Sequence, residues 1–474
     1  MTKNYPAAKA GIFGIGLAAY WDQFPGLKER LEGYQQHVED RIGRWARVVS
    51  VGLVDTAPRA QAAGAYFAQE AVDLIFCYAA TYATSSQVLP VVQEVKVPVV
   101  VLNLQPVAAL DYENTDTGEW LANCSACCVP EISNAFDRSG IPFNVVSGML
   151  FEEEGAWKDI REWCEAAKAV VALRGSRFGF LGHTYPGMLD MYSDFTMHHA
   201  QFGLHVEILE MDDLKERVDN VTEGAVAAKV EEARSVFEID ESVDEGELEW
   251  AAQVAVGLDA LASDFDLNAL AYYYRGSGGS VYERLGAGLI LGNSLLTARG
   301  IPASGEGDLK NAVAMKIMDA LGAGGSFTEF YAMDFEENFL LMGHDGPGHV
   351  AISDRKPVLR GLGLYHGKAG YGVSVEFSVR TGPVTIFAVT QTRDGHLKLL
   401  AAEGESIPGP TLKIGNTNSR IRFSLPPAEF MNAWCEQGPT HHCALGVGHH
   451  AGTLRKVARL LELEFVEVAS RKGG

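Results

Sequence analysis

The stretch VVSVGLVDTAPRAQAAGAYFAQEAVDLIFCYA, residues 48–79, decides how the first part of this chain folds. It opens with a short apolar run, continues through an alanine-rich amphipathic segment and closes with a second apolar run. Apolar runs of this length are typical of strands that are buried on both faces, and the segment between them has helical spacing. The stretch therefore predicts a β-α-β unit with two parallel strands.

The same alternation continues on both sides of this unit. Apolar runs at 11–17 and 97–104 predict two more strands, and residues 27–45 predict a helix after the first. We expect one doubly wound parallel sheet in residues 1–173. In such sheets ligands bind beyond the carboxyl ends of the strands. The glycines of GIFGIG lie inside the first strand and no acidic residue is placed to hold a ribose, which disfavours a dinucleotide site.

The pattern restarts near Arg174, and we expect a second doubly wound domain in residues 174–323. Apolar runs at 177–182 and 204–211 predict strands, and LDALASDFDLNALAYYY contains the end of a helix and another strand. Residues 280–300 predict one further helix. The acidic stretch 230–250 predicts, by its charge, a helical face in contact with solvent.

From residue 324 onward the pattern is typical of β-structure. Apolar and polar residues alternate between Gly, Asp-Gly and Pro breaks, which favours antiparallel strands of a small barrel or sandwich in residues 324–474. The predicted strands are 358–364, 371–379, 383–392, 396–404 and 419–425, followed by a helix at 453–463. The fold class is therefore α/β, with two doubly wound parallel-sheet domains followed by a mainly antiparallel C-terminal β domain.

Composition limits the classes of function. The chain has 474 residues, 47% hydrophobic and 21% charged, as globular proteins of several domains have. Its net charge of -22 disfavours nucleic acid or an anionic membrane as the main partner, whereas a small neutral substrate is indifferent to it. The N-terminus lacks the apolar core of a signal peptide and seven cysteines fit a reducing compartment, so we expect a cytoplasmic protein.

Carboxylates and imidazoles gather between glycines in residues 303–349. Glu306 stands in SGEGD, Glu329 in SFTEFY and His344 in LMGHDG, and His441-His442 adds two more imidazoles. Taken singly, each residue is typical of a turn or a surface. Brought together, two carboxylates and imidazoles suit a divalent cation such as Mn²⁺.

These motifs follow one another in the order found in L-arabinose isomerases, and residues 288–468 resemble the second half of that family. The resemblance implies a metal held by Glu306, Glu329, His344 and His442. It also implies that both glutamates act as acid and base in an aldose-ketose isomerisation through a cis-enediol, the reaction of an intramolecular oxidoreductase. The residues expected to support these ligands are Asp308, Asp345, His349 and His441. Whether His441 or His442 faces the metal stays open.

The N-terminal half departs from the family pattern. The family motif GSQHLYG is replaced by GIGLAAYWDQ, where only the tyrosine, Tyr20, has a match. The family motif NQTAHGGRE appears as NCSACCVPE, with Cys127 at the histidine and Pro130 at the arginine. Met188 matches a pocket methionine and Arg275 falls near a family phenylalanine. We therefore expect Tyr20, Cys127, Met188 and Arg275 to contact the substrate.

Two of these substitutions leave alternatives open. Arg275 suits a substrate with an anionic group, although an ion pair with an acidic side chain of this acid-rich chain is the simpler explanation of an arginine here. Asn123–Cys128 contains three cysteines, but no second pair lies at zinc-site spacing, so we predict small residues that pack at a helix start.

The resemblance places the chain in the arabinose and fucose isomerase superfamily without identifying its sugar. An epimerase or a lyase could use the same metal site, and two α/β domains that flank a crevice also resemble non-catalytic sugar-binding proteins. Arabinose isomerases are hexamers, so a homo-oligomer is expected, with a number of subunits that the sequence does not define.

Overall fold

The computed structural model describes residues 5–151, 154–275, 279–361 and 372–469. It forms two compact units, one of residues 6–171 and one of residues 172–474 with the N-terminal segment up to Tyr5. The ends of two predicted strands, 362–364 and 371, lie outside the described residues. No helix in the described part of the chain is long and apolar enough to cross a membrane.

The first unit contains a five-stranded parallel sheet in the order β2-β1-β3-β4-β5. Four strands coincide with predicted ones, and the doubly wound class is confirmed. The fifth was not predicted because it is an edge strand in which only Val146 is buried, so its sequence lacks an apolar run. The strands are β1 (Lys9–Ile15), β2 (Arg47–Val54), β3 (Leu74–Tyr78), β4 (Val99–Gln105) and β5 (Phe143–Met149).

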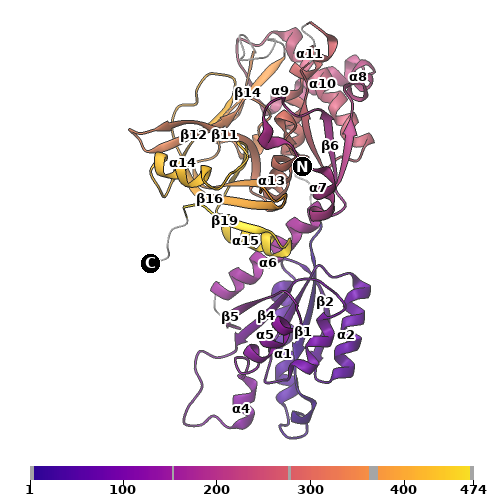
Figure 1. The fold of residues 1–474 in the computed structure, drawn as a ribbon, viewed down its shortest axis with the longest axis vertical. Helices are drawn as coiled ribbons and strands as arrows, with labels where there is room; N and C mark the ends of the chain where they lie inside the picture. The colour runs from indigo at the N-terminus through magenta and orange to yellow at the C-terminus, as the bar shows by residue number, and fades with distance from the viewer. Residues whose placement is uncertain (1–4, 152–153, 276–278, 362–371, 470–474) are drawn as a thin grey trace. The chain divides into compact units, whose positions relative to one another are not determined.

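Helices cover both faces of this sheet (Figure 1). Phe13 and Ile15 of β1 pack against one group of helices, whereas Gly14 points to the opposite face, where Gln35 of α1 leaves no room for a side chain. The first group is α2 (Ala57–Glu70), α3 (Leu89–Val92) and α5 (Val129–Arg138), and the other face carries α1 (Leu27–Ile42). The short segments η1 (Ala18–Tyr20), η2 (Ser85–Gln87) and α4 (Thr117–Ala122) lie beyond the sheet, and α6 (Glu154–Leu173) follows β5.

The second unit begins with a parallel sheet in the order β10-β9-β6-β7. Its strands are β6 (Arg177–Gly182), β7 (His205–Leu209), β9 (Ala269–Tyr273) and β10 (Ala303–Ser304). The accompanying helices are η3 (Leu189–Met191), α7 (Phe195–Phe202), α8 (Met211–Asp219), α9 (Glu223–Val236), α10 (Glu245–Asp264), α11 (Val281–Ala287) and α12 (Leu289–Ala298).

Two predictions about this region are wrong. The helix expected at 280–300 is divided into α11 and α12 at Gly288, which packs so closely on Trp250 and Val254 that a Cβ would not fit. The acidic stretch 230–250 is not one solvated helical face. Instead α9 ends at Val236, β8 (Glu238–Ile239) pairs with β13 (Val358–Gly361), and Phe237 is buried.

The C-terminal strands form an antiparallel barrel, which confirms the predicted β-rich region. Six strands follow the order β15-β18-β11-β12-β17-β16, and the pairing of β15 with β16 closes the ring. They are β11 (Gly324–Asp334), β12 (Phe339–His344), β15 (Gly382–Gln391), β16 (Leu397–Ile407), β17 (Thr417–Phe423) and β18 (Cys443–Val447). β19 (Glu464–Glu467) adds in parallel to β16, and β14 (Val373–Glu376) pairs with β13. The last helices are η5 (Val350–Ile352), α14 (Pro427–Cys435) and α15 (Ala451–Leu460).

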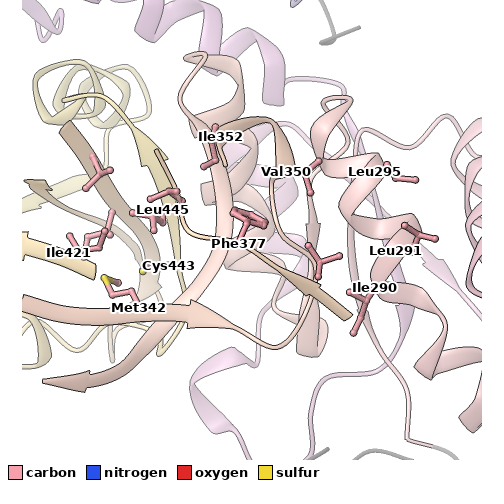
Figure 2. Close-up of a cluster of buried hydrophobic side chains, with 14 of the residues drawn as sticks. Ile290, Leu291, Leu295, Met342, Val350, Ile352, Phe377, Ile421, Cys443 and Leu445 are labelled. Atoms are coloured by element: carbon pink, nitrogen blue, oxygen red, sulfur yellow. The ribbon is translucent and has the colours of Figure 1, made fainter. Parts of the chain in front are cut away.

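Helix α13 (Leu309–Ala320) joins the parallel sheet to the barrel (Figure 1). It contacts β9 and β10 on one side and β11, β15 and β18 on the other, so all of its residues except Asp319 are buried. A continuous apolar cluster extends from α12 through η5 to the barrel strands, where Leu291, Ile352 and Leu445 are among its members (Figure 2). This packing fixes the end of the parallel sheet against the barrel strands that carry the predicted site residues.

Candidate active site

Three predicted ligands lie on neighbouring barrel elements. Strand β11 pairs with both β12 and β18, with Glu329 opposite Gly343 and Thr328 opposite Cys443. Glu329, His344 and His442 therefore occupy adjacent positions across three strands. Gly343 must be a glycine, because a Cβ there would overlap the carbonyl oxygen of Thr417 on β17.

Glu306 reaches the same place from the parallel sheet. It follows β10 in a short 3-10 turn, η4 (Gly305–Gly307), where its φ of 59° lies in the left-handed region. The flanking glycines permit the close packing of this turn: a Cβ on Gly305 would lie 2.7 Å from Phe327, and one on Gly307 would lie 2.6 Å from the carbonyl oxygen of His183. The two glycines of SGEGD thus let the Glu306 backbone approach the barrel.

The imidazoles of His344 and His442 lie next to each other, and the carboxylates of Glu306 and Glu329 approach them. The Nε2 atoms of His344 and His442 face each other at 3.2 Å. His344 Nε2 lies 4.0 Å from Glu306 Oε1 and 3.9 Å from Glu329 Oε1, and His442 Nε2 lies 3.8 Å from Glu306 Oε2. The ring of Phe327 packs against both imidazoles, with centroid distances of 4.0 Å and 4.5 Å. This apolar platform restricts the rotation of both rings.

Carboxylates lie behind both imidazoles, whose Nε2 atoms face the cluster. The fully buried Asp308 places Oδ2 3.0 Å from His442 Nδ1, and its other oxygen accepts the backbone N–H of Asn311 to cap α13. Asp345 Oδ1 lies 3.0 Å from His344 Nδ1, but this nitrogen has no hydrogen-bond partner among the described residues, so only His442 is held by a hydrogen bond. A carboxylate at Nδ1 favours the tautomer with the proton on that nitrogen, which leaves the Nε2 lone pair free to bind a cation.

His441 is oriented differently from His442. Its backbone N–H and Nδ1 both contact Asp190 Oδ2, at 2.9 Å and 2.7 Å, and its Nε2 lies 3.6 Å from Glu306 Oε2. Burial by itself would lower the pKa of His441, but Asp190 and Glu306 raise it to about 10. In contrast, burial lowers the pKa of His442 to about 4 despite its bond to Asp308. His441 is therefore a cation at neutral pH and His442 a neutral imidazole.

The segment 183–194, here called the site loop, connects these groups. Tyr185 donates its backbone N–H to the carbonyl oxygen of Glu306 at 2.9 Å, and Asp190 holds His441. The buried Lys310 of α13 binds the loop from below, with its Nζ 3.1 Å from the carbonyl oxygen of Tyr192 and 3.2 Å from Ser193 Oγ. Neither Asp190 nor Lys310 was predicted, because both act through contacts between segments far apart in the sequence.

The pKa values of the two glutamates are shifted in opposite directions. Burial disfavours the charge of Glu306, but His441, His442 and His344 outweigh it and hold its pKa below the usual range. Burial raises the pKa of Glu329, and the imidazole charges oppose this effect only in part. Such a separation between neighbouring carboxyls is typical of sites that handle protons.

The remaining predicted residues lie in several places. Met188 is on the site loop and exposed, and Arg275 is exposed just after β9. His349 places Nε2 3.4 Å from Asp319, at the end of α13 opposite Asp308. Tyr20 and Cys127 belong to the unit of residues 6–171, where they lie close to each other at the carboxyl end of the sheet. Their contact with a substrate stays a prediction.

The donor set fits a divalent cation. Glu306 Oε2 is buried and has no hydrogen-bond partner among the described residues. The Nε2 atoms of His344 and His442 lie beside it, and a positive charge between these side chains would stabilise the arrangement. Glu329, His344 and His442 offer ligand atoms within 4.8 Å of one another, and so do Glu306, His441 and His442. Oxygen and imidazole nitrogen suit a transition-series ion.

Comparisons with known proteins agree with this arrangement. The family model of the L-arabinose isomerase central domain matches residues 193–324, and that of the L-fucose isomerase C-terminal domain matches residues 358–469. The sulfoquinovose isomerase of Alkalicoccus urumqiensis is 26% identical over 302 residues, which cover 63% of this chain and 66% of the relative. The L-arabinose isomerase of Tolumonas auensis is 24% identical over 359 residues, which cover 69% and 67%.

A second sulfoquinovose isomerase, from Priestia megaterium, is 21% identical over 396 residues and matches 83% of this chain and 85% of its own length. The chain thus spans about two thirds of the first two relatives and more of the third. The two family-model matches include Glu306 and His442, whereas Glu329 and His344 fall between them.

Proposed function

Because this chain matches the models of the L-arabinose isomerase central domain and of the L-fucose isomerase C-terminal domain, we propose that it is a metal-dependent enzyme of that superfamily that interconverts an aldose and a ketose. The observation that carries the proposal is the convergence of Glu306, Glu329, His344 and His442 from the parallel sheet and the barrel. Four side chains of ligand type, with a buried carboxylate oxygen left without a partner among the described residues, are not explained by packing.

We assign metal binding to these four residues, with Mn²⁺ as the expected ion. His442 is the ligand and His441 is not, since His441 is held as a cation by Asp190 and a cationic imidazole has no free lone pair. Asp308 keeps the His442 imidazole in the tautomer that binds a cation. The chemistry that a bound cation supplies is polarisation of the sugar carbonyl, which makes the neighbouring C–H more acidic.

The two glutamates then carry the proton. One carboxylate removes the proton from the carbon next to the carbonyl while the carbonyl oxygen takes up a proton, which gives a cis-enediol. A proton then adds to the former carbonyl carbon while the neighbouring hydroxyl loses its proton to form the new carbonyl. The pair is suited to this exchange because Glu306 is the stronger acid of the two and Glu329 the weaker. The cationic His441 beside Glu306 is placed to donate a hydrogen bond to a substrate oxygen that gains negative charge.

The substrate class follows from the chain's departures from the family pattern. Arg275 follows the carboxyl end of β9. Burial raises the pKa of Tyr273; the charge of Arg275 opposes this shift and that of Glu306 adds to it. A guanidinium that follows a strand of the sheet leading to Glu306 suits a sugar with an anionic group. Two relatives are sulfoquinovose isomerases, whose named substrate is a sulfonated sugar. We propose an acidic sugar, with Met188 beside it.

The test follows proton exchange directly. The protein is stripped with a chelator, Mn²⁺ is restored, and a panel of neutral, carboxylated and sulfonated aldoses and ketoses is followed by NMR in D₂O. Metal-dependent exchange at C1 or C2 with appearance of the isomer is expected. Exchange without isomer formation would favour an epimerase, cleavage products would favour a lyase, and ligand binding without exchange would favour a sugar-binding protein.

Two variants sharpen the test. Glu329→Gln is expected to abolish exchange because it removes one proton carrier. Arg275→Met is expected to raise KM for the acidic sugar by about tenfold or more, because a charge-assisted pair contributes about 1.5–3 kcal/mol. Arg393→Met, in the exposed β15–β16 hairpin, is the matched control. Unchanged kinetics of Arg275→Met would rule out an anionic contact at this position.

A further inference from the structure

Three thiols gather in the first unit, outside the proposed metal site. The segment between α4 and α5 contains Cys124, Cys127 and Cys128, in the spacing Cys-x-x-Cys-Cys. As predicted, a helix starts here, since α5 begins at Val129. The structure adds a proximity that spacing alone does not give: the Cys127 thiol lies close enough to the buried Cys124 thiol to act on its pKa.

The three thiols differ in their access to solvent. Cys127 is exposed, whereas Cys124 is only 5% exposed and Cys128 is fully buried. Cys128 donates its S–H to the carbonyl oxygens of Thr81 and Ser125, at 3.4 Å and 3.3 Å, and packs into the apolar cluster under the sheet. A dissolved reagent therefore reaches Cys127 first, finds Cys124 beside it, and does not reach Cys128.

The pair lies where ligands of doubly wound sheets bind. In the order β2-β1-β3-β4-β5, the direction of winding reverses between β1 and β3, and the crevice opens beyond their carboxyl ends. Tyr20 follows β1 and Tyr82 follows β3. Burial and the neighbouring Tyr82, Cys124, Cys127 and Cys128 raise the pKa of Tyr20, so both tyrosines and the thiols share this edge.

We propose that Cys124 and Cys127 form a redox-active dithiol, which a low-molecular-weight disulfide such as oxidised glutathione converts reversibly to an intramolecular disulfide. The Cys127 thiolate attacks one sulfur of glutathione disulfide and releases one glutathione, which leaves a mixed disulfide. The Cys124 thiolate then attacks the Cys127 sulfur and releases the second glutathione. The protein loses two protons and two electrons, and glutathione disulfide takes up both electrons and becomes two thiols.

The environment of the pair determines its behaviour. Burial raises the pKa of the Cys124 thiol to about 12, so little of it is thiolate at neutral pH and ring closure should accelerate as the pH rises. The new bond would close a loop of four residues beside Tyr20 and Tyr82, without involving Glu306 or its neighbours. The dithiol is thus a modification site at the ligand edge of the N-terminal sheet.

The experiment uses the full chain. The reduced protein is equilibrated with increasing ratios of oxidised to reduced glutathione, quenched with acid, unfolded, alkylated and measured by mass spectrometry. We expect loss of alkylation at Cys124 and Cys127 and a mass lower by two hydrogen atoms, both restored by a dithiol reductant. Cys128 is expected to remain alkylated, and Cys128→Ser, the control, should cyclise like the wild type.

Variants identify the two partners. Cys127→Ser changes an exposed side chain and is expected to form no disulfide in this segment, whereas Cys124→Ser should stop at a glutathione adduct on Cys127. Three results would overturn the proposal: wild-type protein that stays reduced at every ratio, wild-type protein that stops at the adduct, or Cys127→Ser protein that still cyclises through Cys128. The mass of the wild type decides even if Cys124→Ser does not fold.

Discussion

Replacing Asp308 by Asn separates metal binding from the folding of the site. The amide of the Asp308→Asn variant keeps an oxygen that can cap α13, but it places an N–H group where Asp308 Oδ2 now accepts the proton of His442 Nδ1. A donor at that point favours the other tautomer of His442, with the proton on Nε2, and this removes the lone pair that faces His344 and Glu306. If the amide turns the other way, the cap is lost instead.

Loss of a carboxylate behind a ligand histidine weakens metal binding by about 10–100-fold. We therefore expect the Kd for Mn²⁺ to rise by that factor in Asp308→Asn, which equals about 1.4–2.7 kcal/mol of binding free energy. Turnover at saturating Mn²⁺ should recover in large part. The assay is titration calorimetry of the metal-free protein, or detection of free Mn²⁺ by electron paramagnetic resonance.

The control for this variant is Asp244→Asn, because Asp244 caps α10 through Glu247 N–H in the same way but contacts no predicted ligand. It should bind Mn²⁺ like the wild type. Thermal unfolding without metal reports whether either cap has been lost. A folded Asp308→Asn protein whose Kd stays within about twofold of the wild-type value would refute the role of Asp308 in holding His442.

Three further predictions concern the same unit. Asp190→Asn should lower kcat by about tenfold with little change in Mn²⁺ affinity, because Asp190 orients His441 and not His442; an altered Kd with normal kcat would contradict this. Gly307→Ala should lower the free energy of unfolding by about 1–3 kcal/mol more than Gly175→Ala does, as measured by denaturant titration. Both glycines have a positive φ, but only a Cβ at position 307 would clash, with the carbonyl oxygen of His183. Burial and the charge of Lys310 lower the pKa of His198 to about 4, below its unfolded value of about 6.5. The neutral His198 therefore stabilises the fold above pH 6.5, and about 3 kcal/mol of unfolding free energy is lost as the pH falls to 4. His198→Gln should make the unfolding free energy of the metal-free protein less dependent on pH in this range, and an unchanged dependence would exclude His198 as the cause.

The fold was predictable where burial leaves a mark in the sequence. Strands β1, β3 and β4 are buried on both faces, so their sequences are continuous apolar runs. Such runs identify them as buried strands and give their approximate bounds. Strands β5 and β8 lack such runs, because one is a partly exposed edge and the other pairs over two residues only. The division at Gly288 was hidden because α10, distant in sequence, supplies the crowding.

The candidate site was predictable to the extent that its residues stand in motifs. Glu306, Glu329, His344 and His442 follow in the family's order, and the strand register explains why they meet. Asp190 and Lys310 stand in no motif, and their roles appear only when the site loop is seen against His441 and α13. In the sequence Phe327 is an ordinary apolar strand residue, and only the structure shows that its ring packs against both imidazoles.

The proposed metal ligands and the residues of the site loop are held in different ways, so the loop can change while the ligands are retained. The proposed ligands stand on paired strands and at the capped start of a buried helix, where backbone hydrogen bonds and the Phe327 ring fix their positions. Met188 and Asp190 stand instead on the site loop, which is attached through a few polar contacts to Glu306, His441 and Lys310. Substitutions in the loop can therefore alter what is bound without moving the ligands. A substitution at Gly343 or Asp308 would displace the proposed ligands directly, because Gly343 packs against the Thr417 carbonyl oxygen and Asp308 is hydrogen bonded to His442.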